Sequence, residues 1–153
     1  MREPDVVLGD PSAPYLKRWW VIPRNRWLNI YLHRILRSDD DRALHDHPWW
    51  SISIILRGQY VEVMPADVPY VDDPFTGERE FLHRRAVRRS GAVVFRRAEQ
   101  AHRLEVMQPV WTLFITGPRV RDWGFHCQKG WVLWRDYVDA RDNGRVGRGC
   151  GEA

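Results

Sequence analysis

The sequence predicts a single all-β domain, and three observations support this fold class. Residues 19–137 form a series of short β-branched or aromatic runs without a convincing helical period. Gly, Pro, Asp and Asn break these runs at short intervals, which is typical of a sandwich or a barrel. A chain of 153 residues, 44% of them hydrophobic, is long enough for one core and short for two.

The strands follow from the apolar runs, and the turns follow from the residues between them. Arg57-Gly58 ends a long apolar run, Ser90-Gly91 opens another, and residues 72–78 form a loop around a proline and a glycine. We expect a core of about 19–137 with weakly ordered tails at 1–14 and 139–153. The expected strands are 19–22, 28–36, 45–56, 59–64, 80–87, 92–96, 102–106, 110–117 and 131–137.

The charge balance is modestly basic, with 24 Lys and Arg against 20 Asp and Glu and a formal net charge of +4. The excess is spread over short clusters instead of one long block, so we do not expect a nucleic-acid partner. Most of these arginines are expected to face water, although a pair could also hold an anionic substrate. The clusters are Arg84-Arg85, Arg88-Arg89 and Arg96-Arg97.

The cysteines and the N-terminal residues indicate in which cellular compartment the protein is expected. Cys127 and Cys150 lie far apart in sequence, and no basic, apolar and small-residue series marks a signal peptide at the N-terminus. We therefore expect a cytoplasmic protein without a disulfide framework. No apolar run approaches the roughly 18 residues that a membrane span needs, so we expect no membrane partner.

Three histidines predict a metal site. His45 and His47 are separated by one residue, so on a β-strand both imidazoles project from the same face. His102 begins another expected strand and could supply a third ligand. Three imidazoles that converge inside a barrel can hold one divalent ion and leave other coordination positions open.

This histidine pattern resembles the first of the two motifs of the cupin superfamily, G-x5-H-x-H-x(3,4)-E-x6-G. His45 and His47 match the two histidines, and Gly58 matches the closing glycine. Asp39 stands at the opening glycine, and Ser51 falls where the superfamily has a glutamate ligand. The resemblance therefore implies a cupin-type jelly roll, or double-stranded β-helix, that has lost its usual fourth ligand.

The second cupin motif, G-x5-P-x-G-x2-H-x3-N, fits the same chain in spacing more than in identity. Gly91 matches the opening glycine, and counting onward places His102 on the histidine. Arg97, Glu99 and Val106 stand at the proline, glycine and asparagine positions. The two motifs together imply His45, His47 and His102 as the ligands of one metal ion.

Other side chains are expected to line the same barrel. Trp49 shares the alternating face of the two neighbouring histidines and would wall the site, and Ser51 could bind the substrate. Tyr31 and His33 lie on one strand face and could donate protons or hydrogen bonds, although histidines and tyrosines of sheets are more often paired within the protein. The substrate-binding candidates past the Gly117-Pro118 turn are Arg119 and Arg121.

The neutral three-histidine set is similar to that of thiol-dioxygenase-type cupins, in which iron(II) activates oxygen. The resemblance therefore implies a mononuclear iron(II) oxygenase acting on a small organic anion. A zinc, manganese or nickel enzyme that catalyses isomerisation, decarboxylation or hydrolysis is the first alternative, and a non-catalytic binding module is the second. Cupins commonly pair through sheet edges, so a homodimer through Trp19-Trp20 is also expected if that segment is an edge strand.

Overall fold

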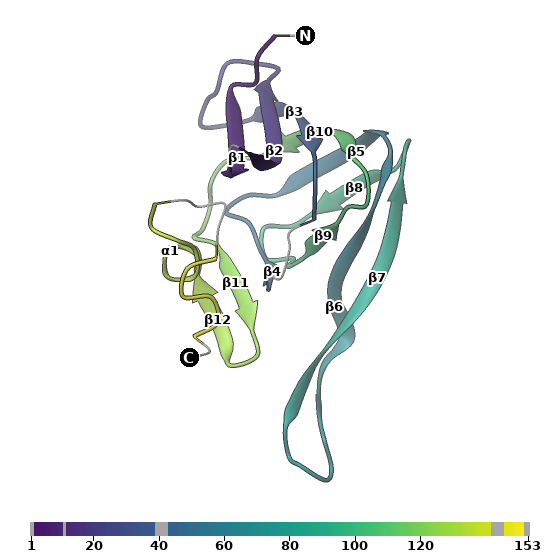
Figure 1. Ribbon diagram of the computed structural model, residues 1–153, viewed down its shortest axis with the longest axis vertical. Coiled ribbons are helices and arrows are strands. Elements are labelled where there is room, and N and C mark those ends of the chain that lie inside the picture. The colour runs from purple at the N-terminus through teal and green to yellow at the C-terminus, as the bar shows by residue number, and fades with distance from the viewer. Residues whose placement is uncertain (1, 11, 39–42, 142–145, 152–153) are drawn as a thin grey trace.

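The computed structural model describes residues 2–10, 12–38, 43–141 and 146–151. Its regular structure is almost entirely antiparallel β-sheet, as the sequence predicts, and the strands form three sheets (Figure 1). The largest sheet contains, in spatial order, β1 (Val6–Asp10), β2 (Ala13–Trp20), β3 (Asn29–Ile35), β10 (Val110–Thr116), β5 (Ser51–Arg57) and β8 (Val93–Arg96).

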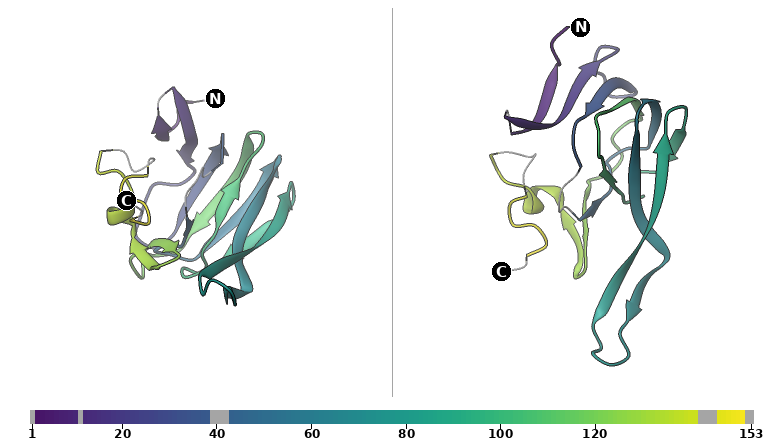
Figure 2. Two further views of the ribbon diagram at one scale, coloured as in Figure 1. Left: turned by 60° about the horizontal axis from the view of Figure 1, so that its bottom comes forward. Right: turned by 45° about the vertical axis from the view of Figure 1, so that its right-hand side comes forward.

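Two three-stranded sheets complete the fold. Figures 1 and 2 show one of them, with the single-turn helix α1 (Trp134–Tyr137), on one side of the molecule and the other on the opposite side. The first sheet contains β12 (Gly130–Leu133), β11 (Gly124–Cys127) and β4 (Leu44–His45). The second contains β7 (Arg79–Arg89), β6 (Gln59–Asp72) and β9 (Arg103–Glu105).

The large sheet buries alternate residues, as expected when one face covers a core. On β3, the buried side chains are Tyr31, His33 and Ile35, and on β5 Ser51 and Ser53 are buried. This inner face therefore combines polar groups with an apolar cluster. The buried members of that cluster are Leu16, Ile35, Ile55, Tyr60, Val94, Val106 and Val110.

The predicted turn at Gly58 connects β5 to β6. The glycine has a φ of 89°, and a Cβ atom there would lie 3.2 Å from the carbonyl oxygen of Pro109. Both features favour glycine, because a side chain would be strained by its backbone conformation and crowded by its neighbour.

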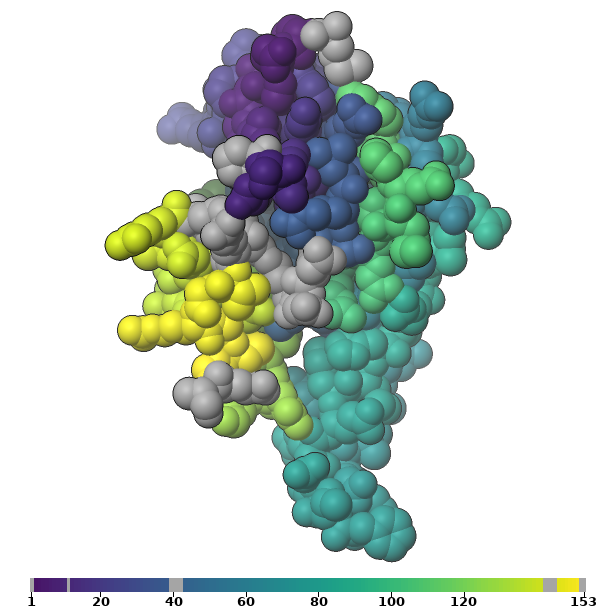
Figure 3. Space-filling view, viewed as in Figure 1, coloured from purple at the N-terminus to yellow at the C-terminus, as the bar shows by residue number. Residues whose placement is uncertain are grey.

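The hairpin of β6 and β7 is longer than the sequence predicts. We expected the first strand to end at residue 64, whereas β6 continues to Asp72 and pairs with β7 up to Arg79. The outer half stands away from the rest of the molecule in the space-filling view (Figure 3). The alternation is interrupted where the pairing skips between Pro65 and Tyr70, which is why periodicity did not reveal the extension.

Two other expected strands also differ. The expected strand 45–56 is interrupted, since β4 ends at His45 and β5 begins at Ser51, with Pro48 between them. Proline cannot donate a hydrogen bond to a ladder, so a break at this point is reasonable. The expected strand 131–137 ends at Leu133 and continues as α1, and β11 was not expected at all.

The N-terminal segment takes part in the sheet. We expected weak order over residues 1–14, but β1 pairs with β2, where Leu8 lies opposite Leu16. β2 therefore has a neighbour on each side, and Trp19 is buried with its ring stacked 5.5 Å from that of Trp111. The pairing with β1 covers β2 from Ala13 to Arg18 and does not extend to Trp19-Trp20, and a homodimer through that segment stays a prediction.

The expectation that the chain has no disulfide is also wrong. Cys127 at the end of β11 is bonded to Cys150, and the bond joins the C-terminal segment to a cluster that contains Phe125 and Tyr137. Disulfides persist in oxidising compartments, so the predicted cytoplasmic location loses one of its supports and stays a prediction. Within the described parts of the chain, no helix has the length and apolar character of a membrane span.

Candidate metal centre

Two short antiparallel segments bring the three predicted histidines together. The backbone N–H of His45 donates to the carbonyl oxygen of His102 at 2.9 Å, and that of His102 donates back at 3.0 Å. The N–H of His47 donates to the carbonyl oxygen of Ala98 at 2.9 Å. The two segments therefore stay paired beyond the end of β4, and the alternation that the sequence predicts for His45 and His47 is preserved.

The imidazoles converge on one point. One ligand atom from each of the three histidines lies within 4.8 Å of the others. The Nε2 atoms of His47 and His102 are 3.0 Å apart, and the three ring centroids are 5.1–5.2 Å from one another. Three ligand atoms gathered this closely make a candidate site for one metal ion.

The electrostatics of the cluster favour the neutral, metal-binding form of the His47 imidazole. Burial lowers the pKa of His47 well below its ordinary value, and the charges of His45, His102, Arg96 and Arg18 lower it further. Neutral imidazole nitrogen is a ligand for iron(II), zinc, manganese and nickel, so the donor set fits a divalent transition metal. Three ligands leave positions open for a substrate or water.

Glu62 on β6 fixes the orientation of His102. The carboxylate oxygen Oε1 of Glu62 accepts a hydrogen bond from Nδ1 of His102 at 3.0 Å, and the glutamate side chain is only 1% exposed. This bond leaves Nε2 on the side of the ring that faces the other histidines, where it lies 3.0 Å from Nε2 of His47. Sequence reasoning missed Glu62, although a carboxylate within the apolar run Tyr60-Val61-Glu62-Val63, on the same alternating face as buried Tyr60, was a signal.

Two arginines hold the Glu62 carboxylate in its ionised form. Nε of Arg96 lies 2.5 Å from Oε1, and Nε of Arg88 lies 2.8 Å from Oε2. Burial raises the pKa of Glu62, but the hydrogen bond from His102 and the charge of Arg96 outweigh it, so that the pKa lies well below its usual range. Arg96 also donates to Ser53 at 3.1 Å, which ties the network to β5.

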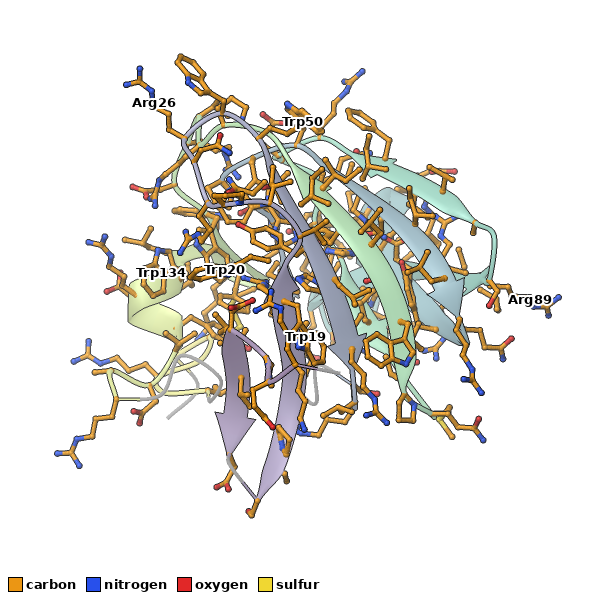
Figure 4. The ribbon with its side chains drawn as sticks, turned by 90° about the horizontal axis from the view of Figure 1, so that it is seen from above. Trp19, Trp20, Arg26, Trp50, Arg89 and Trp134 are labelled. Carbon is orange, nitrogen blue, oxygen red and sulfur yellow. A yellow bond between two sulfur atoms is a disulfide. The ribbon has the colours of Figure 1, made fainter. Side chains whose placement is uncertain are left out.

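The histidines form part of the wall of a cavity of about 360 Å³ that is open to solvent. Several elements contribute the aromatic part of the lining, which consists of Tyr15, Trp49, Tyr60, Phe114, Trp123, Phe125 and Trp134. Figure 4 shows the molecule from above and labels Trp134, the first residue of α1 and a member of this lining. The polar side chains of the lining are Tyr15, Arg18, His33, His45, His47, Ser53, Tyr60, Arg96, His102 and Thr112.

The two candidates for proton transfer, Tyr31 and His33, lie next to Arg18. Nε2 of His33 accepts a hydrogen bond from Nε of Arg18 at 2.8 Å, and the Arg18 guanidinium carbon lies 4.8 Å from the centroid of the Tyr31 ring. His33 lines the cavity. Burial and then the Arg18 charge lower the pKa of His33 well below its ordinary value, so this imidazole is neutral.

Trp49 and Ser51 have different placements. The ring of Trp49 lies on the cavity wall, nearly parallel to that of His47 at a centroid distance of 6.5 Å. Ser51 is buried opposite Arg96 and Thr116 in the large sheet and does not belong to the cavity lining. Its Oγ makes no hydrogen bond to any residue that the structure describes.

Neither of the predicted substrate-binding arginines reaches the cavity lining among the described residues. Arg119 forms an exposed ion pair with Asp122. Nη1 of Arg121 lies 3.0 Å from Oδ2 of Asp46 and donates to the carbonyl oxygen of His47 at 3.3 Å. The cavity lining contains Arg96, a member of one of the arginine pairs that could hold an anion, and Arg18, which was missed because its inward position depends on which strands pair.

Asp46 points away from the metal-binding side chains, as its place between His45 and His47 predicts. It is buried and accepts hydrogen bonds from the backbone N–H of Gly124 at 2.8 Å and from Nε1 of Trp131 at 3.0 Å. Nε2 of His126 lies 3.1 Å from the same carboxylate. Asp46 therefore joins the histidine segment to the β11–β12 hairpin.

Comparison with known proteins identifies the fold. No protein-family model and no curated protein sequence matches the chain. It is similar in structure to an uncharacterized protein with a double-stranded β-helix domain from Klebsiella pneumoniae, with 13% identity, a TM-score of 0.50, and coverage of 76% of this chain and 88% of that one.

Two of the similar structures are named for an activity or a metal. The dimethylsulfoniopropionate (DMSP) lyase DddQ from Ruegeria pomeroyi is 17% identical, with a TM-score of 0.51 and coverage of 80% of this chain and 57% of that one. Fe(II)-HppE with the alternative substrate (S)-1-HPP is 13% identical, with a TM-score of 0.51 and coverage of 76% and 58%. At these identities the similarity shows the fold alone: the chain has the cupin, or double-stranded β-helix, fold that its histidine spacing predicts.

Proposed function

We propose that this chain is a mononuclear metal-dependent enzyme, and that it oxygenates a small organic anion with iron(II) as its metal. The observation that carries the proposal is the convergence of His45, His47 and His102, whose ligand atoms lie within 4.8 Å of one another on the wall of a cavity of about 360 Å³. A ligand triad beside a substrate-sized cavity combines the two requirements of a metal enzyme.

The charges around the triad support an anionic substrate. The three imidazoles add no negative charge, and the carboxylate of Glu62 is balanced by Arg96 and Arg88. Arg18 adds a further positive charge to the cavity wall. The protein groups around the cavity therefore attract an anion even before the charge of a metal ion is counted.

The protein residues would orient the substrate and exclude water. Glu62 orients His102 through Nδ1 while its Nε2 lies 3.0 Å from Nε2 of His47, and the rings of Trp49, Phe114, Trp123 and Trp134 line the cavity. When bound, iron(II) would supply the redox chemistry with dioxygen that no protein side chain provides. Zinc, manganese or nickel suit the same three imidazoles, and the iron of the structurally similar HppE supports the choice of iron.

Metal analysis of the purified and reconstituted protein tests this proposal. The parent should bind about one iron(II) per chain, and His45→Ala, His47→Ala and His102→Ala should each lose most of it. His83→Ala is the matched control, because His83 lies exposed on β7, outside the triad. Full metal retention in the three triad variants would overturn the site.

Oxygen consumption then tests the reaction. The iron-loaded parent should consume oxygen with at least one member of a panel of small carboxylates, and the His102→Ala variant should not. Turnover by the zinc or manganese form without oxygen would overturn the oxygenase in favour of a redox-neutral enzyme. Metal and ligand binding without turnover of any panel member would favour a binding module.

A further inference from the structure

Arg18 is held in place on the cavity wall by two neighbours. It lies on β2 directly opposite His33 on β3, and its Nε donates to Nε2 of that histidine at 2.8 Å. The guanidinium also lies over the ring of Tyr31, with its carbon 4.8 Å from the ring centroid. These contacts fix the plane of the guanidinium and leave its two terminal nitrogens without a hydrogen bond to any described residue.

The charge of Arg18 is not compensated by the described part of the protein. Arg96, the other arginine of the cavity lining, is neutralised by Glu62 at 2.5 Å. Arg18 forms no ion pair with a described carboxylate and faces a neutral histidine. An arginine stays protonated in a protein, and a poorly hydrated cation without a counter-ion is costly, so an anion that enters the cavity gains a strong partner here.

The shape and the single charge of the Arg18 guanidinium favour a carboxylate as the bound anion. Two terminal nitrogens of one guanidinium match the two oxygens of a planar carboxylate in a bidentate pair. A single uncompensated charge balances a monoanion, whereas a phosphate dianion needs further donors. The remaining lining is mostly apolar and aromatic, and a cavity of about 360 Å³ accepts only a small molecule.

The Arg18 guanidinium and the histidine triad share one cavity. Arg18, His45, His47 and His102 all belong to its lining. A carboxylate held by Arg18 therefore lies in the same cavity as the triad, with its apolar body against the aromatic wall.

We propose that Arg18 is the carboxylate-binding residue of the substrate site, and that the substrate is a small monocarboxylate with an apolar or aromatic body. Tyr31 and His33 are positioning residues in this proposal, since they act through Arg18. The bound carboxylate is a substrate only if the proposed metal-enzyme function holds. Carboxylate binding itself can be measured without turnover.

Equilibrium binding of simple probes tests the proposal. Titration of the zinc-loaded and the metal-free protein with benzoate and phenylacetate, followed by tryptophan fluorescence or calorimetry, should show saturable binding. Benzamide, which has nearly the same shape without the charge, should bind at least about tenfold more weakly than benzoate. Inorganic phosphate should bind more weakly than either carboxylate, and tighter phosphate binding would overturn the proposed substrate class.

Variants of Arg18 make the test specific. Arg18→Gln should lose about tenfold or more in benzoate affinity. Arg18→Lys keeps the positive charge but cannot form a bidentate pair with a carboxylate, so its affinity should lie between those of Arg18→Gln and the parent. Arg119→Gln removes an exposed arginine and should bind as the parent does. Equal benzoate affinity of the parent and both Arg18 variants, or no binding of either carboxylate by the parent, would overturn the proposal.

Metal content separates this inference from the proposed function. An Arg18→Gln variant that is folded by circular dichroism and retains its metal, but has lost benzoate binding, confirms the anion site. If the histidine variants show that the protein has no metal site while benzoate binding still depends on Arg18, the enzyme proposal fails and the carboxylate site stands.

Discussion

Glu62 and His102 are joined by a hydrogen bond of 3.0 Å between Oε1 and Nδ1, although the two residues are 40 positions apart in the chain. The pairing of β6 with β9 creates this contact, because Glu62 lies opposite Leu104 in that register. A carboxylate on the far nitrogen of a metal-binding histidine fixes its tautomer and increases its basicity. The relationship gives β6 a direct part in the metal centre.

Glu62→Gln should therefore weaken metal binding without removing any ligand. The amide keeps the size of the side chain but supplies no negative charge to His102, so the metal affinity should fall about 10- to 100-fold. Competition with a chelator of known affinity measures this change. The matched variant Glu105→Gln, which alters the partner of Arg85 and Arg103, should bind metal as the parent does. Unchanged affinity in Glu62→Gln would refute the positioning role.

The same substitution should destabilise the fold. Arg96 is 5% exposed and loses the charge of its partner, and breaking a buried ion pair in this way costs about 3–5 kcal/mol. Chemical denaturation of the metal-free protein measures the free energy of unfolding. A loss as small as that of Glu105→Gln would mean that the buried network contributes little.

The metal-binding triad could be predicted because its signal is local. His45 and His47 differ by two positions, which is enough to place them on one side of an extended segment, and His102 follows a glycine at a spacing that the cupin resemblance provides. Their convergence is confirmed. Glu62 and Arg18 could not be assigned in the same way, because their roles depend on which strands become neighbours and in what register.

The substrate-binding arginines also depend on contacts between residues that the sequence alone does not show. Arg119 and Arg121 follow a strand end, where a barrel mouth was expected, but no pattern in the sequence shows that their charges pair with Asp122 and Asp46. The disulfide between Cys127 and Cys150 could not be predicted for the same reason. Whether two thiols 23 residues apart can bond depends on how α1 folds back against β11, which only the tertiary structure shows.

Asp46→Asn should lower stability while it leaves the triad side chains in place. The buried carboxylate accepts hydrogen bonds from Gly124 and Trp131 and pairs with Arg121. Loss of its charge weakens these interactions, and we expect about 1.5–3 kcal/mol less free energy of unfolding. Denaturant titration measures the loss. Asp122→Asn, at the exposed pair with Arg119, is the control and should unfold at nearly the parent midpoint.

The bond between Cys127 and Cys150 should be detectable chemically and energetically. Denatured protein that has not been reduced should show no free thiol, and reduction should release two. For a loop of this length, Cys150→Ser should cost roughly 3 kcal/mol through the greater entropy of the unfolded chain. The thermal midpoint of the variant should equal that of the reduced parent, and free thiols in the unreduced parent would contradict the bond.

His33 should make the fold less stable as the pH falls. Burial, and then the charge of Arg18, lower its pKa well below the ordinary 6.5, so the unfolded chain binds a proton in the pH range just below 6.5 where the folded protein does not. In that window this group lowers the free energy of unfolding by up to about 1.4 kcal/mol per pH unit. Chemical denaturation at several pH values should give a shallower slope for His33→Gln than for the parent. His83→Gln removes a histidine at the surface of β7 whose pKa is lowered less, so its slope should change less; equal changes in the two variants would show that the Arg18–His33 contact does not control this titration.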